Sequence, residues 1–143
     1  MDPRLLALHT HWLIADSVKY AVFHESSDSK DAKILAKLGP DLGQLAKMHS
    51  AMWRLSVFHA LQYVVIEGYK ELAETDQDVD ALLEPGRVDP LRRFRNAIFH
   101  YQPQPLSHKL LAFLEQPEAA EWARKLHGAF ERYLRKRLDI AES

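Results

Sequence analysis

The chain of 143 residues contains no cysteine. Disulfides, thiolate metal sites and cysteine nucleophiles are therefore excluded for this sequence, and the absence fits a reducing cytosol. No stretch approaches the roughly eighteen apolar residues that a membrane span requires. The opening residues, Met1 to Arg4, do not resemble a secretory signal. We therefore expect a cytoplasmic protein that does not enter a membrane.

Glycine is scarce, with 5 residues, and the chain has no glycine-rich phosphate-binding loop. Neither Glu-x-x-His nor His-Glu-x-x-His occurs, which argues against a di-iron carboxylate bundle and a zinc protease. The 8 histidines form no recognisable metal set, so we expect no metal and no cofactor. The formal net charge is -1, so any contact with nucleic acid must depend on local charge.

The remaining composition favours helices, because Ala, Leu, Glu and Lys are frequent. Apolar residues recur at steps of three and four, and an Asp-Pro pair typical of a helix start stands at 2–3 and again at 89–90. These signals predict helices at residues 3–24, 31–38, 41–74, 90–101, 106–114 and 117–140, with one further helical turn at 79–83. We expect a single all-α domain over residues 1–143, a four-to-five-helix up-and-down bundle.

Most large apolar side chains of these helices are expected in the core. The aromatic residues assigned to it are Trp12, Trp53, Phe58, Trp122 and Phe130. In the last helix the predicted inward residues are Trp122, Leu126, Ala129, Phe130, Tyr133, Leu134 and Leu138.

The helix predicted at 90–101 combines an apolar side with unusual polar residues. At 100° per residue, its core side contains Leu91, Phe94, Ala97, Ile98 and Tyr101. Arg93, Asn96 and His100 fall on the opposite side, with Arg92 at its edge. Arg95 flanks the apolar stripe, roughly 140° from His100 on an ideal helix, so these two side chains do not simply meet.

The same helix carries a local cluster of cations at Arg92, Arg93 and Arg95. Arginine suits bidentate contact with phosphate, and a helix start does not attract cations through its dipole. A histidine within a turn or two of arginines is a reasonable proton-transfer group near neutral pH. The cluster is therefore the best candidate for a functional site.

At Arg95-Asn96-x-x-x-His100 the chain resembles the HEPN family, the higher eukaryote and prokaryote nucleotide-binding domains. That family has an arginine, four to six residues and then a histidine, on a late helix of a four- or five-helix bundle. Many members are metal-independent endoribonucleases that act as dimers, with two motifs facing each other. The resemblance implies an RNA substrate and a homodimer. It also suggests the toxin of a toxin–antitoxin or phage-defence pair, with an antitoxin or nucleotidyltransferase-type protein as partner.

The resemblance also implies roles for single residues. His100 would act as acid or base, and Arg95 would hold the scissile phosphate. Asn96 would orient His100 or contact the phosphate, with Arg92, Arg93 and Tyr101 as supporting residues. The product would bear a 2′,3′-cyclic phosphate. One branch of the family has a tyrosine two residues after the histidine; here Tyr101 follows directly, so that role is not transferred.

Other interpretations stay open. A non-catalytic helical module that binds a nucleotide, RNA or a protein is the main alternative, followed by an oligomeric structural protein. His100 would then bond a carbonyl at a helix end, and Arg95 would pair with an acidic loop residue such as Asp76 or Asp80. The last helix is rich in cations, which form either a solvated charged face or a strip that follows an RNA backbone: Arg124, Lys125, Arg132, Arg135, Lys136 and Arg137.

Overall fold

The computed structural model describes residues 1–23, 37, 40–103 and 107–140, with side chains described for 1–20, 37, 53–103 and 107–140. This part of the chain is all-helical. Its helices are α1 (Pro3–Phe23), α3 (Pro40–Leu72), α4 (Gln77–Asp80), α5 (Pro85–Phe99), α6 (His108–Leu114) and α7 (Ala119–Leu138). The predicted all-α class is confirmed, and five of the predicted helical segments are present. The helix predicted at 31–38 lies almost entirely outside the described residues.

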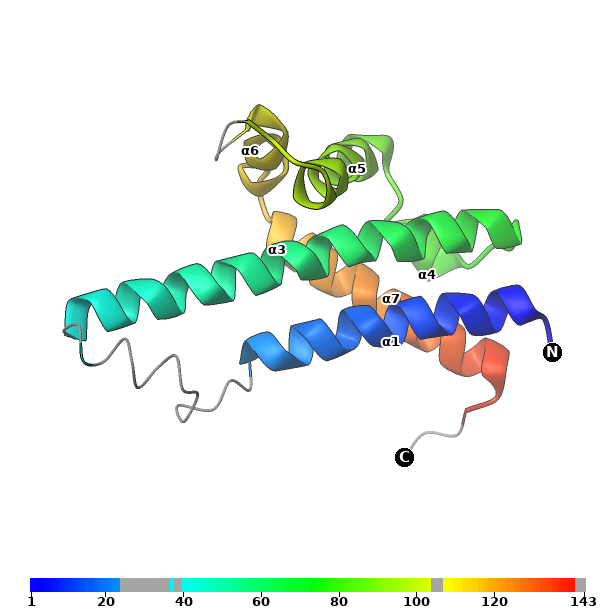
Figure 1. Ribbon diagram of the computed structural model, residues 1–143. Helices are drawn as coiled ribbons and strands as arrows, with labels where there is room; N and C mark the ends of the chain where they lie inside the picture. The colour runs from blue at the N-terminus through cyan, green and yellow to red at the C-terminus, as the bar shows by residue number, and fades with distance from the viewer. Residues whose placement is uncertain (24–36, 38–39, 104–106, 141–143) are drawn as a thin grey trace.

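The helices form a bundle around the long helix α3. Helices α1 and α3 run antiparallel and side by side, and α3 separates α1 from the pair α5–α6 (Figure 1). In Figure 1 helix α5 is seen nearly end-on, whereas α3 is seen along its length. Helix α5 therefore crosses α3 rather than running alongside it. Helix α7 passes obliquely across α1 and α3. None of the helices described has the length and apolar character needed to cross a bilayer.

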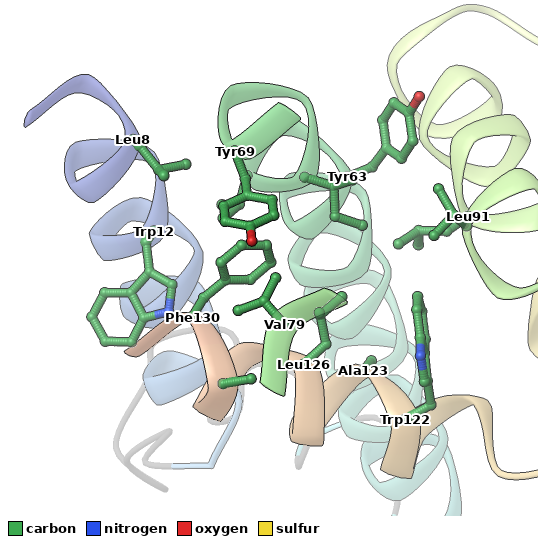
Figure 2. Packing of buried hydrophobic residues seen from close by; sticks show 14 of the residues in the cluster. Leu8, Trp12, Tyr63, Tyr69, Val79, Leu91, Trp122, Ala123, Leu126 and Phe130 are labelled. Carbon is green, nitrogen blue, oxygen red and sulfur yellow. The ribbon is translucent and has the colours of Figure 1, made fainter. Parts of the chain in front are cut away.

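The core is a continuous cluster of buried apolar residues to which all six described helices contribute. Figure 2 shows side chains from α1, α3, α4, α5 and α7 converging on it, with Tyr69 and Phe130 near the middle. The rings of these two residues meet edge to face at 5.5 Å, a favoured aromatic geometry. Most of the aromatic residues expected in the core are buried, including Trp12, Phe58 and Trp122.

The short helix α4 is held in place by polar contacts at its two ends. The Asp76 carboxylate accepts the backbone N–H groups of Asp78 and Val79, both at 3.1 Å, as an N-cap. The Tyr69 hydroxyl donates to the Asp80 carboxylate at 2.8 Å. This fixation places Val79 in the core with no exposed surface. The predicted turn at 79–83 is therefore a helix that begins slightly earlier.

Trp53 was expected in the core but is 52 % exposed. It borders an open hollow between α1 and α3, together with Ser17, Val18 and Val57. At 100° per residue, Trp53 lies roughly 160° around α3 from the buried Tyr69, so it is not on the side of the helix that faces the core. Its assignment to the core rested on its aromatic character, which does not say on which side of a helix a residue lies.

Helix α5 begins five residues before the predicted start, at Pro85 rather than Pro90. Pro85 occupies the first turn, where its missing N–H costs nothing. Pro90 lies inside the helix and has no N–H for the carbonyl of Gly86 one turn earlier. The side-chain amide of Gln116 donates to that carbonyl at 2.9 Å. This hydrogen bond, from the segment after α6, satisfies the carbonyl that Pro90 leaves free, so the helix can include Pro90. The residues around position 90 do not reveal this distant contact.

Helix α5 also ends earlier than predicted. His100 has φ −117° and ψ 142°, which is extended backbone, so the helix stops at Phe99. Tyr101, assigned to the core side by helical periodicity, leaves the helix and is 91 % exposed. The assignment of Tyr101 to the core was therefore wrong. Its cause is local: the 100° rule applies only while the backbone remains helical.

Candidate functional site

The orientation of α5 is set by its apolar side. Leu91, Phe94 and Ala97 are buried as predicted, and Ile98 is partly buried. The Phe94 ring lies 5.0 Å from that of Phe113 on α6. It also contacts His59 on α3, edge to face at 6.3 Å. These contacts lock the rotation of α5 about its axis, and with it the direction in which the polar residues of the motif point.

Arg95 turns toward α3. Its Nη2 atom donates to Glu67 Oε1 at 2.7 Å, and its guanidinium carbon lies 5.0 Å from the centre of the Tyr63 ring. Figure 2 shows Tyr63 reaching from α3 toward α5. An ion pair and a cation–π contact thus hold the side chain, which is only 25 % exposed. Its Nε atom is buried and has no hydrogen-bond partner within the described part of the chain.

The ion pair of Arg95 differs from the one considered from the sequence. Asp76 and Asp80 were the candidates, but both are used to fix α4. The actual partner, Glu67, lies on α3, the helix that α5 crosses. Neither Glu67 nor Tyr63 was identified from the sequence. The sequence shows Glu67 as an acidic residue within a largely apolar helix. That pattern does not indicate which neighbouring helix its carboxylate faces.

His100 is exposed at the end of α5. Its backbone N–H donates to the Asn96 carbonyl at 3.0 Å and closes the helix. Its own carbonyl accepts from the Gln102 amide at 3.3 Å. Within the described residues, the His100 imidazole makes no hydrogen bond to a carbonyl, in contrast to the structural role considered above. The ring is open to solvent and to a ligand.

The other residues of the predicted site surround these two. Arg92 and Arg93 are exposed, and Arg92 has only a long contact of 3.9 Å with Asp89. Asn96 is half-buried, while Phe99 and Tyr101 are exposed on either side of His100. No hydrogen bond joins Arg95 to His100 in the described structure. The predicted residues therefore share one end of one helix, but they do not form a closed site within a single chain.

The buried histidines lie elsewhere and are parts of the core. His127 Nε2 lies 2.9 Å from Asp16 Oδ1, and its ring stacks on Trp12 at 4.8 Å. Burial lowers the pKa of His127, although Asp16 opposes the shift. Burial among aromatic rings lowers the pKa of His59 to about 4. Over the residues described, no three His, Asp or Glu side chains are grouped as a metal site would require.

The cations of α7 are largely matched by acidic residues. Lys125 lies 2.9 Å from Glu121, and the Arg135 guanidinium lies 3.0 Å from Glu131. Arg137 forms two hydrogen bonds with Glu74, whose pKa they lower, with a further contribution from the Tyr133 hydroxyl. This pattern of alternating signs favours the solvated charged face over a continuous basic strip.

The geometry around α5 suits an anionic ligand. Three arginines, two of them exposed, lie within one turn, and an accessible imidazole stands at the helix end. Phe99 and Tyr101, the sequence neighbours of His100, add exposed aromatic surface at this end of α5. Comparisons of the chain with protein-family models, with curated proteins and with solved structures found no match.

Proposed function

We propose that this protein is a metal-independent endoribonuclease of HEPN type, in which Arg95 and His100 carry the reaction. The observation that supports this most directly is the contrast between the two motif residues. Arg95 is held by Glu67 and Tyr63, whereas the His100 ring is exposed at the helix end. Phosphodiester cleavage without a metal needs a fixed cation and an accessible proton-transfer group, and in this proposal the two come together across a dimer.

In this proposal the 2′-hydroxyl of the RNA attacks the neighbouring phosphorus, and the bond to the 5′-oxygen breaks. His100 removes the proton of the 2′-hydroxyl or delivers one to the leaving oxygen. Arg95 donates to the phosphate oxygens, where negative charge develops. The products are a 2′,3′-cyclic phosphate and a free 5′-hydroxyl. Arg92, Arg93 and Asn96 contribute further contacts to the RNA backbone.

The exposed rings beside His100 favour RNA over a free phosphate. Phe99 and Tyr101 lie on both sides of His100 in the sequence, and both are exposed. Aromatic side chains stack on unpaired bases, which contributes on the order of 1–3 kcal/mol per base. Single-stranded RNA offers such bases together with the phosphates that arginine binds. We therefore assign these rings to base stacking next to the scissile bond.

A complete site requires two chains in this proposal. Arg95 faces α3, while His100 ends the helix in extended backbone, and the two side chains are not joined. A dimer with two-fold symmetry would supply a second Arg95 and a second His100 to a shared cleft. The toxin role and the antitoxin or nucleotidyltransferase-type partner follow only from the resemblance of the motif, and they belong to the same proposal.

The first experiment is incubation of the purified protein with a mixed RNA pool in EDTA. We expect cleavage that persists in the chelator and fragments that end in 2′,3′-cyclic phosphate. Such ends resist both ligation and phosphatase until acid opens the ring to a monophosphate, which a phosphatase can then remove. Fragments with 3′-hydroxyl ends, or cleavage that stops in EDTA, would contradict the proposed chemistry. Binding without cleavage by a folded protein would instead favour the alternative, a non-catalytic module that uses Arg95 and His100 to hold RNA.

Glu67→Gln tests whether Arg95 lies at a phosphate-binding position. The carboxylate competes with an incoming phosphate for the guanidinium, so we expect the neutral amide to tighten binding of single-stranded RNA by about fivefold, equivalent to about 1 kcal/mol. The free energy of unfolding should change by less than about 1 kcal/mol, because the pair is partly exposed.

The matched control for this substitution is Glu71→Gln, one turn farther along α3 and exposed. It removes the same charge from the same helix, away from Arg95. Fluorescence anisotropy with a labelled RNA measures both variants under the same salt conditions. Equal affinities for the two variants would contradict the placement of phosphate at Arg95.

A further inference from the structure

The outer face of α1 is apolar although no described helix covers it. Leu6, Leu13 and Tyr20 are exposed on this face and are spaced by seven residues, with Ile14 exposed beside them. Residues seven apart lie on the same side of a helix, so these side chains form one stripe. We call the stripe of Leu6, Leu13, Ile14 and Tyr20 the α1 seam.

The polar residues on this face do not present free hydroxyl groups. The Thr10 hydroxyl donates to the Leu6 carbonyl at 2.9 Å, and the Ser17 hydroxyl donates to the Leu13 carbonyl at 2.8 Å. Both groups are thus bonded within their own helix. The α1 seam is therefore less polar than its composition suggests.

Exposed apolar side chains gather around α1 more than anywhere else in the described structure. Ile140, after α7, lines a hollow shared with Leu13, and Trp53 of α3 lines the hollow beside Ser17. Both are exposed, so they widen the apolar patch on its two sides. Contiguous exposed patches above a few hundred Å² commonly mark interaction sites.

The contrast with α7 shows that the α1 seam is not simply a solvated helix face. Helix α7 carries the closely spaced ion pair of Lys125 with Glu121 on an exposed face. Helix α1 has charged residues only at Arg4, Asp16 and Lys19 over its length. Of these, Arg4 is paired with Asp2 and Asp16 with His127. The charges beside Leu13 belong to Glu131 and Arg135, which line the adjacent hollow and are paired with each other at 3.0 Å.

The spacing of the seam fits a second copy of the same helix. Leu13 lies midway between Leu6 and Tyr20 in the sequence. If two α1 helices cross antiparallel about a two-fold axis at Leu13, then Leu13 meets Leu13, and each Leu6 meets the Tyr20 of the other copy. Antiparallel helices also align their dipoles favourably. A parallel pair would place the two large Tyr20 rings together and leave the two Leu6 ends farther apart.

We propose that the α1 seam is a self-association surface through which two copies of this chain pair antiparallel. The contact does not depend on the proposed ribonuclease activity. Helix α3 separates α1 from α5 (Figure 1), so pairing through α1 leaves both motif surfaces free. The paired helices are about 31 Å long at 1.5 Å per residue, a small interface, so the association depends on protein concentration.

Leu13→Lys tests the surface by placing a charge at the two-fold axis. We expect this substitution to halve the mass of the assembly measured by sedimentation over a range of concentrations. Leu114→Lys is the matched control, because Leu13 and Leu114 are exposed to 45 % and 44 %. Leu114 ends α6, far from α1 in the fold. Cleavage of RNA per chain is expected to stay unchanged in Leu13→Lys, so this result and the ribonuclease assay are read independently.

Single cysteines test the geometry, since the chain has none of its own. With a mild oxidant, Leu13→Cys is expected to form a disulfide-linked dimer quickly. Leu6→Cys alone should react no faster than Leu114→Cys, whereas a mixture of Leu6→Cys and Tyr20→Cys should cross-link. Equal masses for the wild type and Leu13→Lys, or no faster reaction of Leu13→Cys than of Leu114→Cys, would overturn the proposal. Rapid cross-linking of Leu6→Cys with itself would overturn the antiparallel arrangement.

Discussion

Replacing His100 with alanine is expected to lower the rate of RNA cleavage by roughly 10²–10⁴-fold, the usual contribution of a positioned acid or base. The reason is that His100 supplies the exposed imidazole of the motif, which transfers the proton in the proposed reaction. The fold should be unaffected, because His100 is exposed and its backbone N–H, not its ring, closes the helix. We expect the free energy of unfolding to change by less than about 0.5 kcal/mol.

Single-turnover cleavage of a defined RNA measures this effect, since it reports the chemical step. The comparison variant is Arg124→Ala, which removes an exposed charge from α7 and leaves the motif intact. The cleavage rate of Arg95→Lys adds a second comparison. This substitution keeps the positive charge but loses the planar guanidinium that contacts phosphate in two places. A His100→Ala protein that cleaves at the wild-type rate would show that His100 does not transfer the proton.

The stability of the protein is expected to fall as the pH is lowered from 7 toward 4. His59 is only 2 % exposed, among the rings of Phe58, Phe94 and Phe113. Its Nδ1 atom is buried without a hydrogen-bond partner in the described structure. Burial disfavours the charged imidazolium, so the pKa of His59 is about 4 in the folded protein, below its ordinary value of 6.5.

The sign of the effect follows from which state binds the proton. Between pH 6.5 and pH 4 the unfolded chain carries a proton on His59 and the folded protein does not. Protonation therefore favours unfolding as the pH falls. At about 1.4 kcal/mol per pH unit, the loss is about 2 kcal/mol by pH 5 and about 3 kcal/mol by pH 4. The lowered pKa of His127 acts in the same direction.

Urea unfolding measured at several pH values between 7 and 5 tests this expectation. His59→Leu removes the titrating group and fills similar apolar space, so the free energy of unfolding should depend much less on pH in this variant. The control is His108→Leu, the same substitution at an exposed histidine. If His59→Leu keeps the full pH dependence of the wild type, the loss arises from another group.

Much of the helical architecture is predictable from local sequence. The apolar repeat of α7 correctly assigned Trp122, Leu126, Phe130 and Tyr133 to the core, because a helix that packs along one side must bury that side throughout. The start of α1 was predicted from Asp2-Pro3, whose preference for a helix start requires no distant contact. The long helix α3 was likewise predicted from its period alone.

The errors occur where a distant contact overrides a local preference. The expected start of α5 at Pro90 was wrong because Gln116, from beyond α6, donates to the carbonyl that the proline leaves free. Trp53 was assigned to the core from its aromatic character, but it lies on the side of α3 away from Tyr69 and borders the open hollow beside α1. Tyr101 was placed in the core by a periodicity that ends with the helix at Phe99.

The sequence by itself determined the all-helical class, most helix positions and the concentration of arginine, asparagine and histidine on α5, because these depend on nearest neighbours and periodicity. Only the tertiary structure decided which helix α5 crosses. That crossing pairs Arg95 with Glu67 and Tyr63 and leaves His100 exposed. Within the described part of the chain it also leaves the α1 seam exposed. The physical reason is that a helix period states which side is apolar, whereas the partner of that side depends on how all the helices pack together.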